Sequence, residues 1–193
     1  MAVTQRTLFH ELPDLPEGFQ YKDAVCLRSG AGAHQEFSRL PFKEFEFRGF
    51  LGKRRTVSFG WRYDFNVREL QAAEGIPSFL LDLRQAAAEF AGLSDEQLQH
   101  ALVTEYSPGA AIGWHKDRPE FREVIGMSLL ARCLFRLRRK AGQRWQRASI
   151  ELQPRSAYLL RGASREAWQH SIPPVDTLRY SVKFRSLRES KDS

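Results

Sequence analysis

The chain has 193 residues, of which 42% are hydrophobic and 27% charged, proportions that suit one soluble domain with a buried core. No apolar run approaches the roughly 20 residues that span a bilayer, and the first residues lack the apolar stretch of a signal peptide, so we expect neither a membrane partner nor export. Cys26 and Cys133 lie far apart and are expected to be free thiols of a cytoplasmic monomer.

Positive charge is in excess and clustered. The net charge is +7, and one cluster is Lys53-Arg54-Arg55. A second cluster comprises Arg136, Arg138, Arg139, Lys140, Arg144 and Arg147. Such clusters favour a polyanionic partner, nucleic acid first, although they are also typical of solvated surfaces.

The first half of the chain contains few regular patterns. Residues 1–20 have no strong periodicity and are expected to form an arm. Alternating aromatic residues predict a strand over 54–65, in which Gly60 indicates a bulge or a close approach. Apolar residues at helical spacing predict a helix over 78–93, and residues 94–97 match a capping box.

The second half has the alternation and turn residues of a β structure. We expect short strands at 99–106, 113–116, 124–130, 132–138, 147–152, 157–161, 168–172 and 179–185. Eight short strands with proline or glycine at the turns predict a mainly β, α+β fold built on a double-sheet jelly roll.

One constellation of residues indicates chemistry. His115 and Asp117 are two positions apart on an extended segment, so their side chains point the same way. With His170 from another strand they would supply the two imidazoles and one carboxylate that are typical of non-haem Fe(II) oxygenases. Arg179 and Arg185 share one face of a strand, and two inward-facing arginines require an anion.

From about residue 102 to 185 the chain resembles the AlkB family of Fe(II)- and 2-oxoglutarate-dependent dioxygenases. The resemblance rests on four blocks in order, which are Tyr106-Ser107-Pro108-Gly109, His115-Lys116-Asp117-Arg118-Pro119-Glu120, His170, and Arg179 to Arg185. It implies one domain over 1–193, with an N-terminal extension of helices and a β nucleotide-recognition lid at about 1–98. The jelly-roll (double-stranded β-helix) core would span about 99–186, and a polar tail 187–193.

The resemblance also implies roles for individual residues. His115, Asp117 and His170 match the iron ligands. The co-substrate, 2-oxoglutarate, would be bound by Arg179, Arg185 and Tyr106, together with Thr104 and Ser181, which stand where the family often has asparagine. Substrate contacts are expected from Trp61, Tyr63, Glu120, Lys53, Arg54 and Arg55.

The implied function is oxidative demethylation of N-alkylated bases in DNA or RNA, a repair reaction that uses Fe(II), 2-oxoglutarate and oxygen and releases formaldehyde. Single-stranded nucleic acid is the expected partner. One alternative is the same oxygenase chemistry on a protein side chain or small molecule, because fold does not fix substrate. Another is a non-catalytic nucleic-acid binding module. A zinc hydrolase is disfavoured because it would not need the paired arginines.

Overall fold

The structure is a computed structural model that describes residues 15–25, 31–47, 50–64 and 69–188. Within these ranges the side chains of 31–34, 45–47, 50–51, 62–64 and 69–70 are not described. Across this part of the chain, every helix is too short or too polar to traverse a lipid bilayer.

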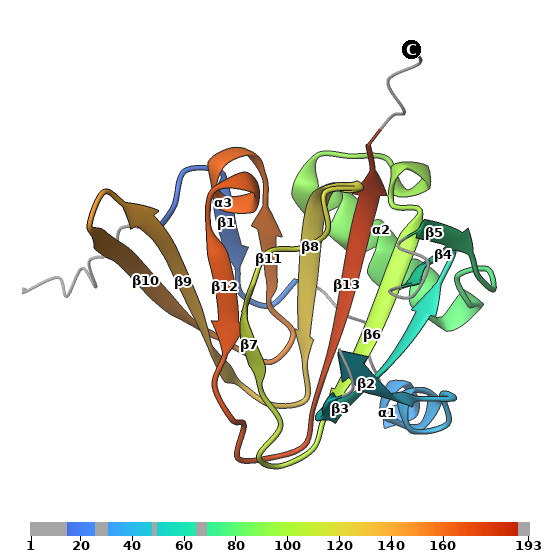
Figure 1. Cartoon of the computed structure of the whole chain (residues 1–193). Coiled ribbons are helices and arrows are strands. Elements are labelled where there is room, and N and C mark those ends of the chain that lie inside the picture. Colours follow the sequence, from blue (N-terminus) through green and yellow to red (C-terminus); the bar gives the residue numbers. More distant parts are fainter. Residues whose placement is uncertain (1–14, 26–30, 48–49, 65–68, 189–193) are drawn as a thin grey trace, which may run out of the picture.

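Two antiparallel sheets face each other and form the body of the fold (Figure 1). The major sheet runs in the order β1 (Phe19–Lys22), β11 (Ala157–Leu160), β8 (Phe121–Leu129), β13 (Arg179–Leu187), β6 (His100–Tyr106), β3 (Phe50–Phe59) and β2 (Lys43–Phe47). The minor sheet runs in the order β10 (Arg144–Leu152), β9 (Cys133–Ala141), β12 (Gln169–Ile172) and β7 (Ile112–His115).

From β6 to β13 the strands alternate between the sheets in the jelly-roll order, except that β9 and β10 form a hairpin within the minor sheet, and this order confirms the predicted fold class. Because most connections cross from one sheet to the other, residues far apart in sequence line the same interior. Each of the eight strands expected from alternation corresponds to one of these, with boundaries that differ by up to three residues.

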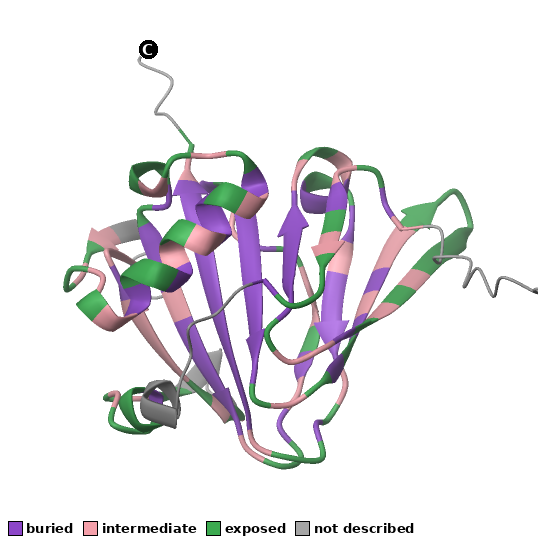
Figure 2. Cartoon of the chain, turned by 180° about the vertical axis from the view of Figure 1, so that it is seen from behind, coloured by how far each residue is buried: buried purple, intermediate pink, exposed green. Residues whose placement is uncertain are grey.

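Helices and a hairpin flank the major sheet. The predicted helix over 78–93 is a 3-10 turn η1 (Ser78–Leu80) followed by α2 (Leu81–Ala91), and the capping box closes the turn η2 (Asp95–Gln97). The remaining elements are α1 (Ala31–Ser38), α3 (Gly162–Glu166) and the hairpin of β4 (Trp61–Asp64) and β5 (Glu69–Ala72). Figure 2 shows α2 lying across the buried strands with its outer side exposed.

The two faces of the major sheet pack into two different apolar clusters. Val103, Met127, Val182 and Phe184 point to the side covered by α2, whose Leu83, Ala87 and Ala91 complete this apolar core. A second apolar cluster, which includes Phe135, Leu137 and Tyr158, fills part of the space between the sheets. Because side chains alternate along a strand, the odd-numbered residues of β13 point into that space.

Two expectations about the first half need revision. Residues 1–20 were expected to form an arm, but the last two of them open β1, which pairs with β11 across a long sequence separation. The expected strand over 54–65 is divided at Gly60, which has φ 75° and separates β3 from β4. A Cβ at Gly60 would lie 2.0 Å from the carbonyl oxygen of Gln99, so only glycine fits this close approach.

Candidate iron and co-substrate site

The site is built on the inner face of β13. Arg179, Ser181, Lys183 and Arg185 alternate along this strand and are all buried. The strand is held between β6 and β8, which satisfy its backbone on both sides. Three cationic side chains therefore face a single interior, an arrangement that is costly without anions to pair with them.

Two histidines and one aspartate meet opposite this strand. His115 on β7 is paired with His170 on β12, and their ring centroids are 4.2 Å apart. Asp117, two residues further on, is 8% exposed, and its Oδ2 lies 3.4 Å from His170 Nε2. The structure thus brings together the three residues expected from the sequence to bind iron.

Both imidazoles are prepared to act as neutral ligands. Burial, and then the charge of Lys183, lowers the pKa of His115 to about 4 and holds the pKa of His170 well below its usual value. His115 Nδ1 lies 2.9 Å from the carbonyl oxygen of Gly113, an acceptor that favours the tautomer with the proton on Nδ1. In that tautomer Nε2 keeps its lone pair for a metal.

The carboxylate of Asp117 stays ionised. Burial by itself would raise its pKa, but Lys183 and Arg185, with the two histidines, hold the pKa well below its usual range. Arg185 Nη2 donates to Oδ1 at 2.6 Å, whereas Oδ2 has no hydrogen-bond partner among the described residues. An unpaired, buried carboxylate oxygen beside two neutral imidazoles fits a divalent metal.

The three proposed ligand side chains are not arranged around a single metal position in this structure. Among the described residues, no group of three histidine, cysteine, aspartate or glutamate side chains is arranged as a ready metal site. Lys183 Nζ lies 3.3 Å from His170 Nε2 and 3.8 Å from Asp117 Oδ1, so an ammonium group stands beside the atoms that would bind the metal. Burial lowers the pKa of Lys183 to about 8, against the opposing effect of Asp117.

Arg179 is prepared to bind an anion. It is 1% exposed, its guanidinium lies 4.9 Å from the ring centroid of Tyr106, and its Nη2 donates to Ser128 Oγ at 3.1 Å. Its Nε and Nη1 have no partner among the described residues, and neither does Ser181 Oγ. A buried guanidinium with two unsatisfied donors can donate further hydrogen bonds to an anion such as a carboxylate.

Arg185 links the aspartate to a residue that sequence reasoning missed. Its Nη1 lies 3.2 Å from Nδ1 of the buried His100, and its guanidinium lies 4.8 Å from the ring centroid of Phe121. Burial, and then the charge of Arg185, keeps the pKa of His100 well below its usual value, so the ring accepts from the guanidinium. Lys183 was missed as well, although alternation along 179–185 places it on the same face as the arginines.

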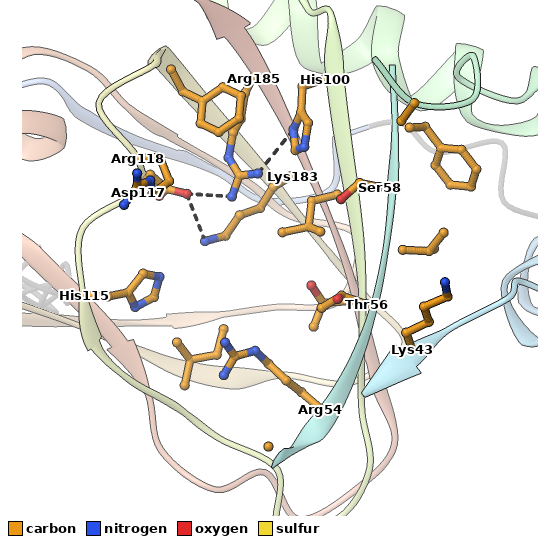
Figure 3. A pocket seen from close by; sticks show the side chains of 18 of the residues that line it. Lys43, Arg54, Thr56, Ser58, His100, His115, Asp117, Arg118, Lys183 and Arg185 are labelled. Carbon is orange, nitrogen blue, oxygen red and sulfur yellow. Dashed lines mark hydrogen bonds and ion pairs between the residues drawn. The ribbon is translucent and has the colours of Figure 1, made fainter. Parts of the chain in front are cut away.

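A cavity of about 1130 Å³ opens onto this centre (Figure 3). Its walls come from β3, β6, the β7 segment with Asp117, and β13. Thr104, which was expected to contact the co-substrate, lines it, as do His115 and Lys183. This volume lies slightly above the usual range for small-molecule sites, which is about 300–1,000 Å³.

The basic segment at 53–55 is divided between the two faces of β3. Arg54 lines the cavity and donates to the carbonyl oxygen of Ala111 at 3.3 Å. Arg55 points to the opposite face, where it forms an ion pair with Glu105 at 2.7 Å. Lys53 is exposed. The structure therefore brings Arg54, and not Arg55, to the cavity, because neighbouring residues of a strand point to opposite faces.

The other expected substrate residues lie further out. Trp61 is half-buried on β4 and pairs across the hairpin with Ala72, which lines the cavity. The side chain of Tyr63 lies outside the described residues. Glu120 is half-buried, with Oε1 3.6 Å from Arg118 Nη2, and it is not among the described residues that line the cavity.

The chain is similar to known proteins. The 2OG-Fe(II) oxygenase superfamily matches residues 33–189. The chain is 26% identical over 164 residues to the alkylated DNA repair protein ALKBH8 homolog of Arabidopsis thaliana, covering 72% of this chain and 47% of that protein. It is 29% identical over 110 residues to the uncharacterized protein L905 of Acanthamoeba polyphaga mimivirus, covering 50% of this chain and 52% of that protein. The chain thus spans about half the length of these relatives.

Two solved structures share the fold. The structure of OsALKBH1 superposes with a TM-score of 0.65 at 16% identity, covering 89% of this chain and 98% of that one. A 2OG-Fe(II) oxygenase from Burkholderia pseudomallei superposes with a TM-score of 0.60 at 14% identity, covering 89% and 86%. Because the family match spans most of the chain, the chain belongs to the 2OG-Fe(II) oxygenase superfamily, whose members are dioxygenases that use Fe(II), 2-oxoglutarate and oxygen, and it is similar to AlkB homologues.

Proposed function

We propose that this protein removes alkyl groups from N-alkylated bases of nucleic acid, DNA or RNA, by oxidation. The observation that carries the proposal is a two-histidine, one-carboxylate centre close to a strand that also carries a buried, half-satisfied arginine. His115 and Asp117 of this centre line a cavity that has Arg54 on its wall. When bound, the iron supplies the oxidising chemistry that hydroxylates an N-linked alkyl carbon, and the hydroxylated product separates into formaldehyde and the free base.

The protein's own residues bind and orient the reactants. His115, Asp117 and His170 would hold the iron, and Arg185 keeps Asp117 ionised and fixed. Arg179, whose Nε and Nη1 have no partner among the described residues, would bind the far carboxylate of 2-oxoglutarate. The Tyr106 hydroxyl and the hydroxyls of Thr104 and Ser181 offer further hydrogen bonds. Ser181 Oγ supports this role because it is buried and has no hydrogen-bond partner in the part of the chain that the structure describes.

A nucleic-acid substrate is supported by charge at the cavity and beside it. Arg54 lines the cavity, and Lys53 is exposed next to it on β3. Trp61, on the hairpin whose other strand reaches the cavity through Ala72, is a candidate platform for an extruded base. Glu120 is retained as a candidate base contact, one that would require its contact with Arg118 to open.

A second basic surface begins at the cavity mouth. Trp114 lines the cavity, and the guanidinium of Arg138 lies 4.4 Å from the Trp114 ring centroid and 4.3 Å from that of the exposed Trp145. Arg136 also lies over Trp114, at 5.1 Å. We call Trp114, Arg136, Arg138 and Trp145 the Arg–Trp face. Its cations beside aromatic rings suit the backbone and bases of a single strand.

The deciding experiment is mass spectrometry of short methylated DNA and RNA oligonucleotides after incubation with Fe(II), 2-oxoglutarate and oxygen. We expect loss of the methyl group with release of formaldehyde, and no loss without 2-oxoglutarate or in the His115→Ala protein. Consumption of 2-oxoglutarate without loss of methyl from any oligonucleotide would refute the nucleic-acid substrate. That result would favour a protein or small-molecule substrate for the same oxygenase.

A further inference from the structure

Lys183 occupies a place that the proposed reaction does not explain. Its side chain is 5% exposed, and its Nζ approaches both His170 Nε2, at 3.3 Å, and Asp117 Oδ1, at 3.8 Å. Figure 3 shows it extending from β13 towards Asp117. Two of the three proposed metal ligands are therefore in contact with a fixed ammonium group before any metal binds.

Within the described ranges, the only carboxylate that pairs with the Lys183 ammonium is one that it shares with Arg185. Asp117 is already bonded to Arg185 Nη2 at 2.6 Å, so Lys183 is the second cation on that carboxylate and the more distant one. Arg179, on the same face of the strand, adds a further buried positive charge. A divalent metal placed among these groups is repelled by each of them, and the repulsion is strong where water is excluded.

A negatively charged co-substrate removes this conflict. A carboxylate bound between the metal and Lys183 would be attracted by both, and it would give the ammonium a partner that it does not share with Arg185. A lysine that disfavours the metal alone therefore favours the metal and the anion together. Because coupling between two binding sites is reciprocal, the metal would tighten the anion by the same factor.

We propose that Lys183 couples metal binding to co-substrate binding. In the absence of co-substrate its ammonium competes with the metal for Asp117 and His170. With a 2-oxo acid bound, the same ammonium pairs with the carboxylate nearest the metal. This inference rests on the proposed iron site, and its chemical class of ligand is a 2-oxo dicarboxylate.

The test is a metal titration, which needs no turnover. Free Mn(II) is measured by electron paramagnetic resonance, with and without saturating 2-oxoglutarate, for the wild type and for Lys183→Met and Lys183→Arg. Met has a similar length and no charge, whereas Arg keeps the charge. Lys116→Met is the matched control, because Lys116 is a lysine of the same cavity wall whose Nζ is bonded to the carbonyl oxygen of Glu166.

We expect Lys183→Met to bind Mn(II) alone more tightly, by about tenfold, and to lose about tenfold of the tightening that 2-oxoglutarate confers on the wild type. Both changes are within the usual range of about 5- to 150-fold for coupled sites. Lys183→Arg should retain the coupling, and Lys116→Met should leave it unchanged. If Lys183 served only in packing, Lys183→Met would weaken the binding of both Mn(II) and 2-oxoglutarate. The factor by which 2-oxoglutarate tightens Mn(II) binding would then stay the same.

Three results would overturn the inference. Weaker Mn(II) binding by Lys183→Met with an unchanged ratio contradicts the competition. The competition is also contradicted if Lys183→Met leaves both the Mn(II) affinity and the tightening by 2-oxoglutarate unchanged. In both cases, loss of Mn(II) binding by His115→Ala would show that the iron site itself is correctly assigned. If His115→Ala binds Mn(II) like the wild type, the proposed iron site fails and the coupling fails with it. Melting curves show whether Lys183→Met folds. If it does not, Lys183→Arg, which keeps the charge, still tests the coupling.

Discussion

Replacing Arg179 by methionine separates the effect of this residue on the stability of the unliganded fold from its effect on co-substrate binding. In the protein without ligand the guanidinium is 1% exposed and makes one hydrogen bond, to Ser128, while Nε and Nη1 have no partner among the described residues. Without its carboxylate ligand, this buried guanidinium should therefore destabilise the fold. Arg179→Met should remove this destabilisation and abolish the binding of 2-oxoglutarate.

The magnitudes follow from the contacts. Each unsatisfied buried donor costs about 1–3 kcal/mol, and the lost hydrogen bond to Ser128 contributes about 1 kcal/mol in the opposite direction. Replacement of a buried charge by an apolar residue of similar size is often neutral or stabilising. Two such donors less one hydrogen bond give about 1–5 kcal/mol, and the lost contact between the guanidinium and the Tyr106 ring reduces this sum. We expect the free energy of unfolding of unliganded Arg179→Met to rise by about 1–2 kcal/mol, or about 2–8 °C in Tm for a chain of this length.

The assay is thermal unfolding with and without Mn(II) and 2-oxoglutarate. At a ligand concentration of about 100 times Kd, 2-oxoglutarate should stabilise the wild type by about 2.7 kcal/mol, and this shift should vanish in Arg179→Met. Arg165→Met is the control. Arg165 is also buried, but its Nη2 donates to the backbone carbonyls of Phe121 and Arg118, so this variant should lose stability by about 2 kcal/mol.

The reasoning would be refuted if unliganded Arg179→Met lost more than about 2 kcal/mol while keeping the shift with 2-oxoglutarate. That pattern would make Arg179 a structural residue like Arg165. Loss of the shift together with equal or higher unliganded stability is the pattern that a pre-organised anion site requires.

The remaining predictions concern the metal, the fold and the nucleic acid. His115→Ala should abolish turnover and Mn(II) binding, and turnover that persists in this variant would contradict the iron assignment. Gly126→Ala should destabilise the fold by about 2–3 kcal/mol, because its Cβ would lie 2.2 Å from ring atoms of the buried Tyr158, and denaturant unfolding should show partial rescue by Tyr158→Leu. Arg54→Ala should weaken oligonucleotide binding and reduce its salt slope by about one, whereas the neighbouring Arg55→Ala should leave the slope unchanged. Equal effects of the two variants on fluorescence anisotropy titrations would exclude Arg54 from a specific contact.

The major sheet illustrates how far local patterns reach. Alternation along 179–185 required Arg179 and Arg185 to share a face, and the same rule places Lys183 beside them. The aromatic alternation of 54–65 predicted strand and singled out Gly60. Both results depend on backbone geometry that neighbouring residues impose, so they can be read from a short window of sequence.

The β1 strand illustrates where such patterns end. Residues 19–22 carry little periodicity of their own and become a strand because β11, more than half of the chain away, offers them a free edge. Likewise, alternation states that Arg54 and Arg55 point to opposite faces, but not which face borders the cavity. That choice depends on β6, whose Glu105 pairs with Arg55 and whose Thr104 lines the cavity beside Arg54.

The sequence by itself therefore determined the fold class, the family and the set of residues from which a metal and co-substrate site can be built. These follow from alternation along the strands and from the order and spacing of short sequence blocks, which can be recognised without knowing how the rest of the chain folds. Only the tertiary structure decided that Arg179 is left with two unpaired donors, that His100 supports Arg185, and that Lys183 stands among the proposed ligands. Such contacts join strands from both sheets, and their energies depend on burial and on charges that are distant in sequence.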